Sequence, residues 1–161
     1  MTNFYVKTRP VVPETDDSFL FEVYAGTRLD EMVLWGWSAE EQSDFLKMQY
    51  RCQKESYRLQ YPGLLSQIIL VGDNRAGRIL TARKEEELIL VDIALLPRFR
   101  GKGIGIAILK DLQREAAAAG LFIKLSVLEG NPAGRLYERL GFQPIERKEP
   151  YTVMQWQPNK K

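Results

Sequence analysis

One segment of the sequence combines glycines and basic residues at the end of an apolar stretch. It contains Arg98, Arg100, Gly101, Lys102, Gly103 and Gly105. Glycines let backbone amides approach a ligand closely, and the first amides of a helix that begins here have no acceptor inside that helix. The helix dipole and the basic side chains add positive potential. The segment therefore predicts a site for a phosphate or pyrophosphate, with a solvated glycine-rich turn as the simpler alternative.

Two common nucleotide-binding loops fit this segment poorly. A Walker loop ends in Lys-Ser or Lys-Thr, and no such pair follows these glycines. A dinucleotide-binding turn places its first glycine at the end of a strand and an acid about 20 residues further on. Here Pro97–Arg100 intervenes before the first glycine, and Glu129 is too distant. A nucleotide-binding protein that uses the same loop stays open as an alternative.

The composition excludes several kinds of chemistry. The 161 residues include no histidine and one cysteine, Cys52, so we expect no histidine-dependent catalysis, no disulfide within the chain and no metal site. Lys and Arg total 23 against 21 Asp and Glu. This net charge of +2 gives no general reason to expect nucleic acid, a membrane or a strongly acidic substrate as partner.

The hydrophobic content indicates a globular chain. Hydrophobic residues make up 45% of the sequence and charged residues 27%. The amino-terminal residues lack the basic region and apolar run of a secretory signal. The most apolar strand-length stretch, Leu88–Leu96, is far shorter than the roughly 20 residues of a membrane span. We therefore expect a single domain over residues 1–161 and a cytoplasmic location.

The elements that must position the glycine-rich segment follow from apolar periodicity. In chain order the pattern predicts a strand, two helices, three strands, a helix, a strand, a helix and two strands, an α/β or α+β arrangement. The strands are expected between Phe4 and Val12 and over Ser66–Val71, Arg78–Ala82, Leu88–Leu96, Phe122–Leu128, Phe142–Ile145 and Tyr151–Trp156.

Capping residues mark the ends of the predicted helices. The boundaries fall at Thr15–Asp17 and Gly26, at Ser38 and Tyr61, at Ile104 and Gly120, and at Asn131 and Gly141. A further turn or short helix is expected over Arg28–Leu34. Ser38 and Glu41 form a capping box. Phe45, Met48 and Cys52 follow at helical spacing, which predicts that Cys52 is a buried structural thiol.

Two motifs in this order resemble a known family. Arg100-Gly-Lys-Gly103-Ile-Gly105 matches the Q/R-x-x-G-x-G/A signature of the GNAT N-acetyltransferases, which bind acyl-CoA. That signature lies between a central strand and a helix, as expected here. The later segment Asn131–Phe142 contains the Asn, Ala and Tyr before Leu-Gly-Phe that are also typical. The close resemblance covers about Leu88–Trp156, and the amino-terminal half fits by the order of its elements.

The resemblance implies a fold and a co-substrate. The fold would be a mixed, mostly antiparallel central sheet flanked by about four helices, with a splayed central strand pair. Acetyl-CoA would be the co-substrate. Its pyrophosphate would bind the amides of Arg100, Gly101, Lys102, Gly103, Ile104 and Gly105. Its pantetheine arm would lie along the backbone of Ile93, Ala94, Leu95 and Leu96 and near Asn131, Ala133 and Tyr137.

The resemblance also implies direct transfer of the acetyl group to an amine of a small molecule or protein. Tyr137 would protonate the departing thiolate, because a phenol with a pKa near 10 is protonated at neutral pH. Asp92, the only acid inside its apolar strand, is the candidate base. Each residue also has a structural interpretation: Tyr137 as a packed aromatic, Asp92 as a hydrogen-bonded buried acid and Asn131 as a helix cap.

For the acceptor site and for a dimer interface, the sequence offers candidate residues but no diagnostic motif. In this family the first helices wall the acceptor site, and the candidates there are Tyr24, Arg28, Trp35, Trp37, Tyr57 and Tyr61, with Tyr151 as a later one. Trp35, Trp37 and Trp156 are candidates for a homodimer interface. A non-catalytic acyl-CoA-binding module that lacks a base and an acceptor site is the alternative to an enzyme.

Overall fold

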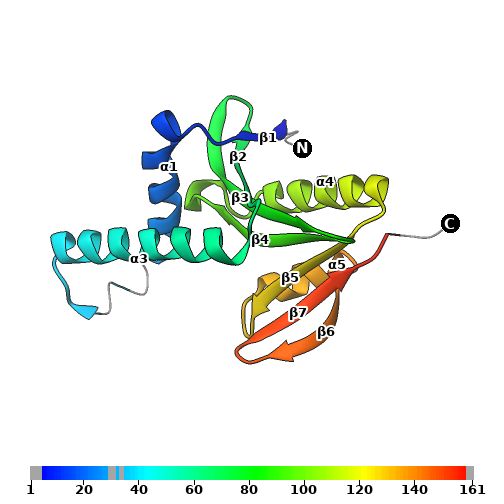
Figure 1. The fold of residues 1–161 in the computed structure, drawn as a ribbon. Helices are drawn as coiled ribbons and strands as arrows, with labels where there is room; N and C mark the ends of the chain where they lie inside the picture. Colours follow the sequence, from blue (N-terminus) through cyan, green and yellow to red (C-terminus); the bar gives the residue numbers. More distant parts are fainter. Residues whose placement is uncertain (1–4, 29–31, 33–34, 159–161) are drawn as a thin grey trace.

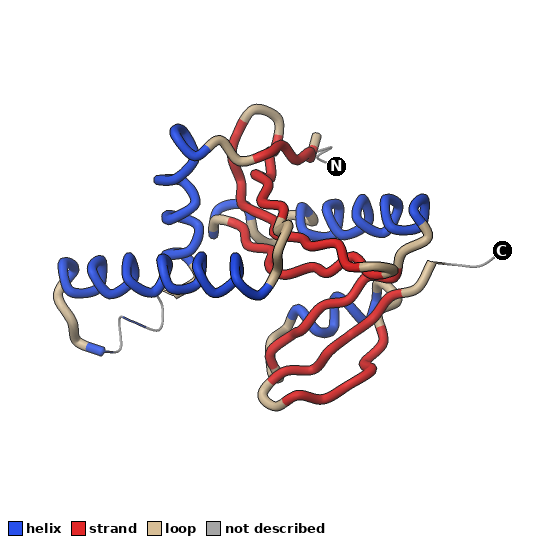
Figure 2. Tube along the Cα trace, viewed as in Figure 1, coloured by secondary structure: helices blue, strands red, loops and turns tan. Residues whose placement is uncertain are grey.

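The computed structural model describes residues 5–28, 32 and 35–158 and contains one seven-stranded sheet in the order β1-β2-β3-β4-β5-β7-β6 (Figures 1 and 2). The strands are β1 (Val6–Pro10), β2 (Leu65–Val71), β3 (Asn74–Lys84), β4 (Glu87–Leu95), β5 (Phe122–Leu128), β6 (Gln143–Lys148) and β7 (Tyr151–Trp156). The described helices are α1 (Pro13–Gly26), α3 (Ala39–Gln60), α4 (Ile104–Ala119) and α5 (Ala133–Arg139), with a 3₁₀ turn, η2, at Pro97–Phe99. The predicted order of elements and the mixed, mostly antiparallel sheet are confirmed.

The central strands β4 and β5 form the parallel pair of the sheet and separate after one short stretch. They pair over Glu87–Leu90 and Phe122–Leu125, whereas the other neighbouring strands pair antiparallel. Beyond Leu90 the two strands have no mutual pairing, and Figure 1 shows β5, β7 and β6 fanning away from β4. The predicted splayed pair is confirmed, and it leaves the carboxyl-terminal half of β4 with a free edge.

A β-bulge in β4 sets the direction of the side chains next to this opening. Leu80 of β3 pairs with Asp92, but Thr81 pairs with Leu90, so Val91 is an extra residue in β4. An extra residue shifts the alternation of side chains between the two faces of a strand. Asp92 therefore lies on the same face as Leu80 and Arg78, the face on which α3 packs.

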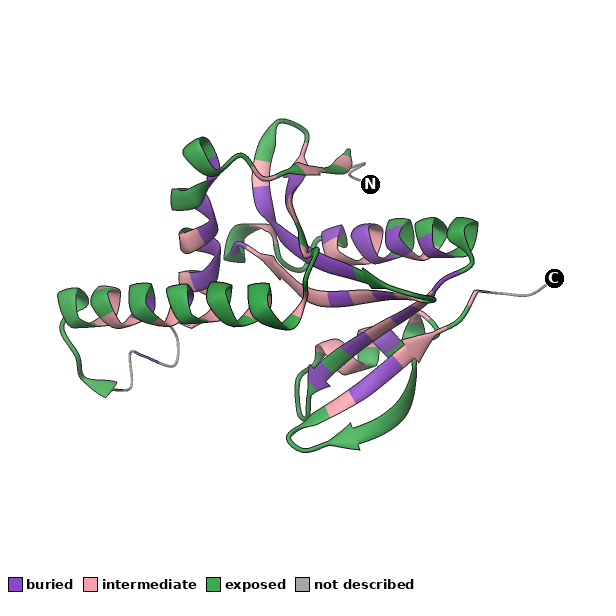
Figure 3. Ribbon diagram, in the orientation of Figure 1, coloured by how far each residue is buried: buried purple, intermediate pink, exposed green. Residues whose placement is uncertain are grey.

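Two hydrophobic clusters cover the two faces of the sheet. Ile69 of β2 packs in one cluster with α4 and α5, while its neighbours Ile68 and Leu70 pack in the other with α1 and α3. Figure 3 shows the sheet-facing side of α4 buried and most of α3 exposed. The sheet is thus a middle layer between two pairs of helices, and it is covered less completely on the α3 side.

Helix α1 begins earlier than predicted because Asp16 fixes its first turn. The carboxylate of Asp16, which is fully buried, accepts a hydrogen bond from the Val12 N–H at 2.8 Å. It also pairs with Arg9 at 2.7 Å and with Arg75 at 3.1 Å. The helix starts at Pro13, where a missing N–H costs nothing, instead of at Thr15. The predicted end at Gly26 is confirmed.

The prediction for the packed face of α3 was wrong, although its start was right. The capping box of Ser38 and Glu41 is present, with both hydrogen bonds formed. The buried residues of the helix are Leu46 and Tyr50, whereas Met48 is 48% exposed and Cys52 is exposed. The face of α3 that packs on the sheet contains Leu46 and Tyr50 and not Met48 and Cys52. Cys52 is therefore a surface thiol and not a buried one.

The remaining boundaries differ from the predictions by small amounts. β5 and β7 match, and Gly120 caps α4 in the left-handed conformation, as predicted. β3 begins at Asn74, so the turn before it comprises only Gly72 and Asp73. Phe4 and most of the predicted turn at Arg28–Leu34 lie outside the described residues. In the described part of the chain, no helix is long and apolar enough to cross a membrane.

Candidate functional site

The glycine-rich loop adopts backbone conformations that side chains rarely allow. It leads from η2 into α4, and Gly101 and Gly103 have φ values of 71° and 80°. A Cβ atom added at either glycine would have no atom within 4 Å. The glycines are therefore required by the left-handed backbone and not by crowding, and the space beside them is open.

Six consecutive N–H groups in this loop have no acceptor in the described part of the chain. The Arg100 N–H donates to the Pro97 carbonyl at 3.1 Å, and the next N–H that donates is Ala107, to Gly103 at 3.1 Å. The N–H groups between them belong to Gly101, Lys102, Gly103, Ile104, Gly105 and Ile106. They lie at the amino-terminal end of α4, where the helix dipole is positive. This arrangement can bind a phosphate group, and it begins one residue later than predicted.

The side chain of Arg100 holds the loop in place. Its Nε donates to the Leu95 carbonyl at 3.0 Å, and its Nη2 lies 3.4 Å from the Gly26 carbonyl. The guanidinium thus ties the loop to the end of β4 and to the end of α1. Lys102 is exposed, and Ile104 is buried in the core. The unpaired loop amides are therefore held beside an exposed arginine whose guanidinium is already hydrogen-bonded to backbone.

A cavity of about 390 Å³ lies where β4 and β5 separate. Of the predicted site residues it is lined by Asp92, Ile93, Ala94, Asn131 and Tyr137. Four of the acceptor-site candidates, Tyr24, Arg28, Tyr57 and Tyr151, also line it. Trp35, Trp37 and Tyr61 are not among its lining residues. The structure therefore brings the carboxyl-terminal half of β4, the start of α5 and the helices α1 and α3 to one cavity.

Tyr137 of α5 lines the cavity and also packs in the hydrophobic core beneath it. It is 9% exposed, and its ring lies 5.8 Å from that of Phe142. Its hydroxyl has no hydrogen-bond partner among the described residues. Burial raises the pKa of Tyr137, and the negative charge of Asp92 raises it further. The phenol is therefore protonated at neutral pH and free to donate to a group in the cavity.

Asp92 is held by a buried arginine that the sequence analysis did not select. Arg78 is 5% exposed, and its Nη2 lies 2.6 Å from Asp92 Oδ2 and 3.0 Å from Gln53 Oε1. The Asp92 side chain is 27% exposed toward the cavity. The signal for Arg78 was present in the sequence, because a charged residue within the apolar run of β3 requires a partner.

Asn131 was predicted as the N-cap of the last helix, but the N-cap position is Pro132, and Asn131 instead hydrogen-bonds to the first residue of the helix. Its Oδ1 accepts a hydrogen bond from the Ala133 N–H at 2.9 Å. The helix begins at Ala133, one residue later than predicted. Asn131 also lines the cavity, and its bond to Ala133 fixes it at the edge of that space. Within the described ranges, no group of three or more His, Cys, Asp or Glu side chains is placed to hold a metal ion.

Comparisons with known proteins agree with this architecture. Residues 66–144, about half of the chain, match the family model described as Acetyltransferase (GNAT) domain. The PaiA N-acetyltransferase of Thermoplasma acidophilum, solved in complex with coenzyme A, is 18% identical over 94% of this chain and 98% of its own, with a TM-score of 0.70. No curated protein sequence matches the chain.

Two further solved structures share the fold over nearly their whole length. PH1933 from Pyrococcus horikoshii is 22% identical, covering 96% of this chain and 99% of its own, with a TM-score of 0.69. The ribosomal-protein-S18-alanine N-acetyltransferase of Escherichia coli is 18% identical over 97% of this chain and 96% of its own, with a TM-score of 0.65. The family match and the shared fold together show that this chain belongs to the GNAT acetyltransferase family.

Proposed function

We propose that this protein transfers an acetyl group from acetyl-CoA to an amine in a single direct step. The observation that carries the proposal is the series of six free N–H groups from Gly101 to Ile106, beside the free edge of β4. Loop amides without an acceptor and an unpaired strand edge lie next to each other, an arrangement that suits a ligand with a pyrophosphate and an amide-containing arm. The complex of the Thermoplasma relative with coenzyme A supports the same ligand.

The residues present fit such a ligand. The amides of Gly101–Ile106 would hold the pyrophosphate. The backbone of Ile93–Leu95, unpaired on its β5 side, would hydrogen-bond to the amides of the pantetheine arm. The Leu96 N–H donates to Ala76 at 2.8 Å, so Leu96 contributes by packing and not by that N–H. Asn131 and Ala133 would border the arm on the α5 side.

Acetyl-CoA would supply a thioester carbonyl that an amine can attack. Asp92 would accept the proton that the amine nitrogen loses as the nitrogen–carbon bond forms, directly or through one water. Tyr137 would donate its hydroxyl proton to the sulfur as the carbon–sulfur bond breaks. The two transfers balance, because one proton leaves the amine and one reaches the thiolate. No covalent bond to the protein is required.

One observation favours a second candidate, a non-catalytic acyl-CoA-binding module. Asp92 Oδ2 lies 2.6 Å from Arg78 Nη2, a contact that joins two strands whether or not the protein has a catalytic base. In an enzyme, Asp92 would accept the proton of the amine, directly or through one water, while it stays paired with Arg78. In a module, the Asp92–Arg78 pair would only join β3 to β4.

Two measurements separate these candidates. Binding of acetyl-CoA is measured by calorimetry, and release of free CoA thiol is followed with a panel of primary amines. The proposed function predicts both binding and thiol release, with the acetyl group found on nitrogen by mass spectrometry. Binding without thiol release from any amine would favour the module, and absence of binding would contradict both.

A further inference from the structure

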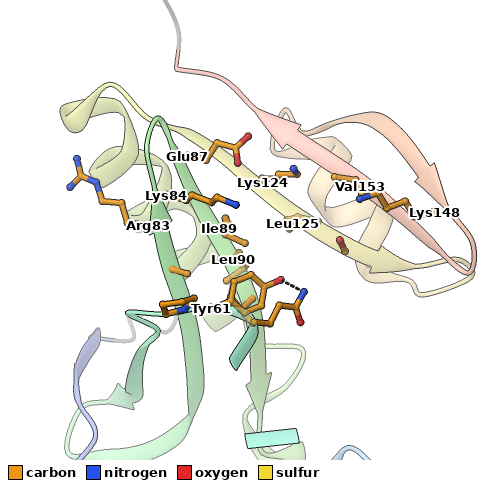
Figure 4. Close-up of a pocket in the computed structure, with 15 residues that line it drawn as sticks. Tyr61, Arg83, Lys84, Glu87, Ile89, Leu90, Lys124, Leu125, Lys148 and Val153 are labelled. Carbon is orange, nitrogen blue, oxygen red and sulfur yellow. Dashed lines mark hydrogen bonds between the residues drawn. The ribbon is translucent and has the colours of Figure 1, made fainter. Parts of the chain in front are cut away.

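A groove of about 700 Å³ adjoins the cavity of Asp92 and Tyr137 and has no role in the proposed chemistry so far. It lies over the amino-terminal half of β4, between the end of α3 and β6 (Figure 4). The two spaces share four lining residues, Leu90, Val91, Leu125 and Ser126. The groove therefore adjoins the site at which an amine would be acetylated.

Three lysines from separate strands face this groove. Lys84 comes from the end of β3, Lys124 from β5 and Lys148 from the end of β6. Figure 4 shows Lys84 and Lys148 extending toward each other, with Lys124 between them. Lys84 and Lys124 form no ion pair with a described residue, and Lys148 is 3.9 Å from Glu146. Glu87 is the one acid among the lining residues, so the lysines outnumber the acids three to one.

The position of the groove separates it from the predicted coenzyme site. The glycine-rich loop follows the carboxyl-terminal end of β4 at Leu95, whereas the groove lies over Glu87–Val91 at the other end of the strand. A ligand held by the loop and by the free edge of β4 would reach the cavity from the opposite side. The groove is thus left for the second substrate.

We infer that the acceptor is a small amine whose far end carries two or more negative charges. This inference rests on the proposed function, and it specifies the substrate class of the same site. The amine would lie beside Asp92, and its carboxylates or phosphate would lie among Lys84, Lys124 and Lys148. The size of the groove is typical of sites for small molecules. Lysines that converge from three strands match a compact anion.

The near-neutral composition of the chain does not oppose this assignment. The net charge is +2, yet folding collects Lys84, Lys124 and Lys148 from positions up to 64 residues apart. A local group of like charges raises the concentration and affinity of an anion even when the whole protein is nearly neutral. The electrostatic potential that a bound substrate meets is set by the lysines of this groove and not by the net charge of the whole chain.

The first test measures anion binding without catalysis. Citrate, which carries three carboxylates, is titrated into the wild type and into the variant K84Q/K124Q/K148Q. We expect the affinity for citrate to fall by at least about tenfold in the variant, in line with the modest strength of each exposed charge pair. Lys110→Gln, on the exposed face of α4 and away from the groove, is the control and keeps the wild-type affinity. Equal affinity in the wild type and the triple variant would overturn the inference.

The second test measures selectivity among matched amines. Rates of CoA thiol release are compared for phosphoserine against serine and for glutamate against glutamine. We expect kcat/KM to favour the acidic member of a pair, and that preference to fall about tenfold in the triple variant. A wild type that binds acetyl-CoA but prefers neutral or cationic amines would overturn the inference and leave the proposed function intact. Absence of acetyl-CoA binding would instead overturn the proposed function.

Discussion

Arg78 Nη2 lies 2.6 Å from Asp92 Oδ2, across the neighbouring strands β3 and β4. The pair exists because the bulge at Val91 turns Asp92 toward the face that Arg78 occupies. Arg78 is nearly fully buried, and its Nε has no hydrogen-bond partner among the described residues. Asp92 is therefore the group that balances a buried charge, and it also faces the cavity beside Tyr137.

Removing the charge of Asp92 is expected to destabilise the protein. Asp92→Asn leaves the Arg78 guanidinium buried without an ionic partner, and we expect a loss of about 1–3 kcal/mol in the free energy of unfolding, discounted for the partial exposure of Asp92. The double variant R78M/D92N should recover part of this loss. Urea unfolding of Asp92→Asn, of Arg78→Met and of the double variant gives the coupling energy between the two side chains. Strictly additive losses would mean that the pair does not interact.

Tyr137→Phe tests the proposed proton donor. The hydroxyl forms no hydrogen bond with a described residue, so we expect the free energy of unfolding to change by less than about 1 kcal/mol. We expect kcat to fall by about a hundredfold, with KM for acetyl-CoA unchanged. An unaltered kcat would show that Tyr137 only packs against Phe142.

The pH dependence of kcat follows from the direction of the Tyr137 pKa. Burial, and then the charge of Asp92, raise this pKa above its ordinary value of about 10. The donor form of Tyr137 is therefore lost only above about pH 10, and the alkaline limb of kcat should lie there. In Asp92→Asn one of the two causes is removed, so that limb should move to lower pH. A limb that stays in place would contradict the link between the two residues.

Much of the fold follows from local sequence signals, and the parts that do not are those set by distant contacts. Ser38 and Glu41 cap α3 through bonds within four residues, so the start of that helix was predictable. Its packed face depends on how it crosses the sheet, and no local signal placed Leu46 and Tyr50 inward and Cys52 outward.

The same distinction applies to the candidate site. Gly101 and Gly103 indicate a loop with left-handed backbone conformations without reference to distant contacts, and the loop was predicted from them. The ion pair of Arg78 with Asp92 depends on a bulge and on the register of two paired strands. Neither feature can be predicted from the local sequence around these residues. The convergence of Lys84, Lys124 and Lys148 depends on three strands that are far apart in sequence.

Gly77 permits the close approach of β3 to β4 at the site. A Cβ atom there would clash with the Ala94 carbonyl oxygen and lie 2.9 Å from Leu95 Cδ2. Gly77→Ala should therefore force the strands apart, with a loss of about 2 kcal/mol or more in stability and a weaker affinity for acetyl-CoA. Gly26→Ala is the control, since its Cβ would meet Pro97 Cδ at an ordinary 3.5 Å. Thermal unfolding and calorimetry that give equal values for both variants would argue against this constraint.

Asp16 makes the stability of the protein sensitive to acid. The hydrogen bond from Arg9, with others from Val12 and Arg75, holds the pKa of the Asp16 carboxyl well below its usual range. A lowered pKa in the folded state stabilises the protein above the unfolded value of about 3.9, and the contribution is lost as the pH falls below it. Asp16→Asn should therefore flatten the decline in stability between about pH 5 and pH 2.

The matched variant for this prediction is Asp17→Asn, which changes an exposed neighbour on the same turn. It should keep the wild-type slope of stability against pH, as measured by urea unfolding at each pH. Equal slopes in the wild type and in Asp16→Asn would exclude Asp16 as the source of the acid sensitivity.

The most direct test of the proposed coenzyme site is calorimetric titration of CoA into Gly103→Glu and Gly72→Glu. Both glycines have positive φ values, 80° and 60°, and a Cβ at either has no atom within 4 Å, so the two variants share backbone strain and added charge. Gly103 lies among the free N–H groups of the loop, whereas Gly72 lies in the turn between β2 and β3. We predict that Gly103→Glu loses CoA binding and that Gly72→Glu keeps it. Binding of equal strength in both variants would contradict the assignment of the loop.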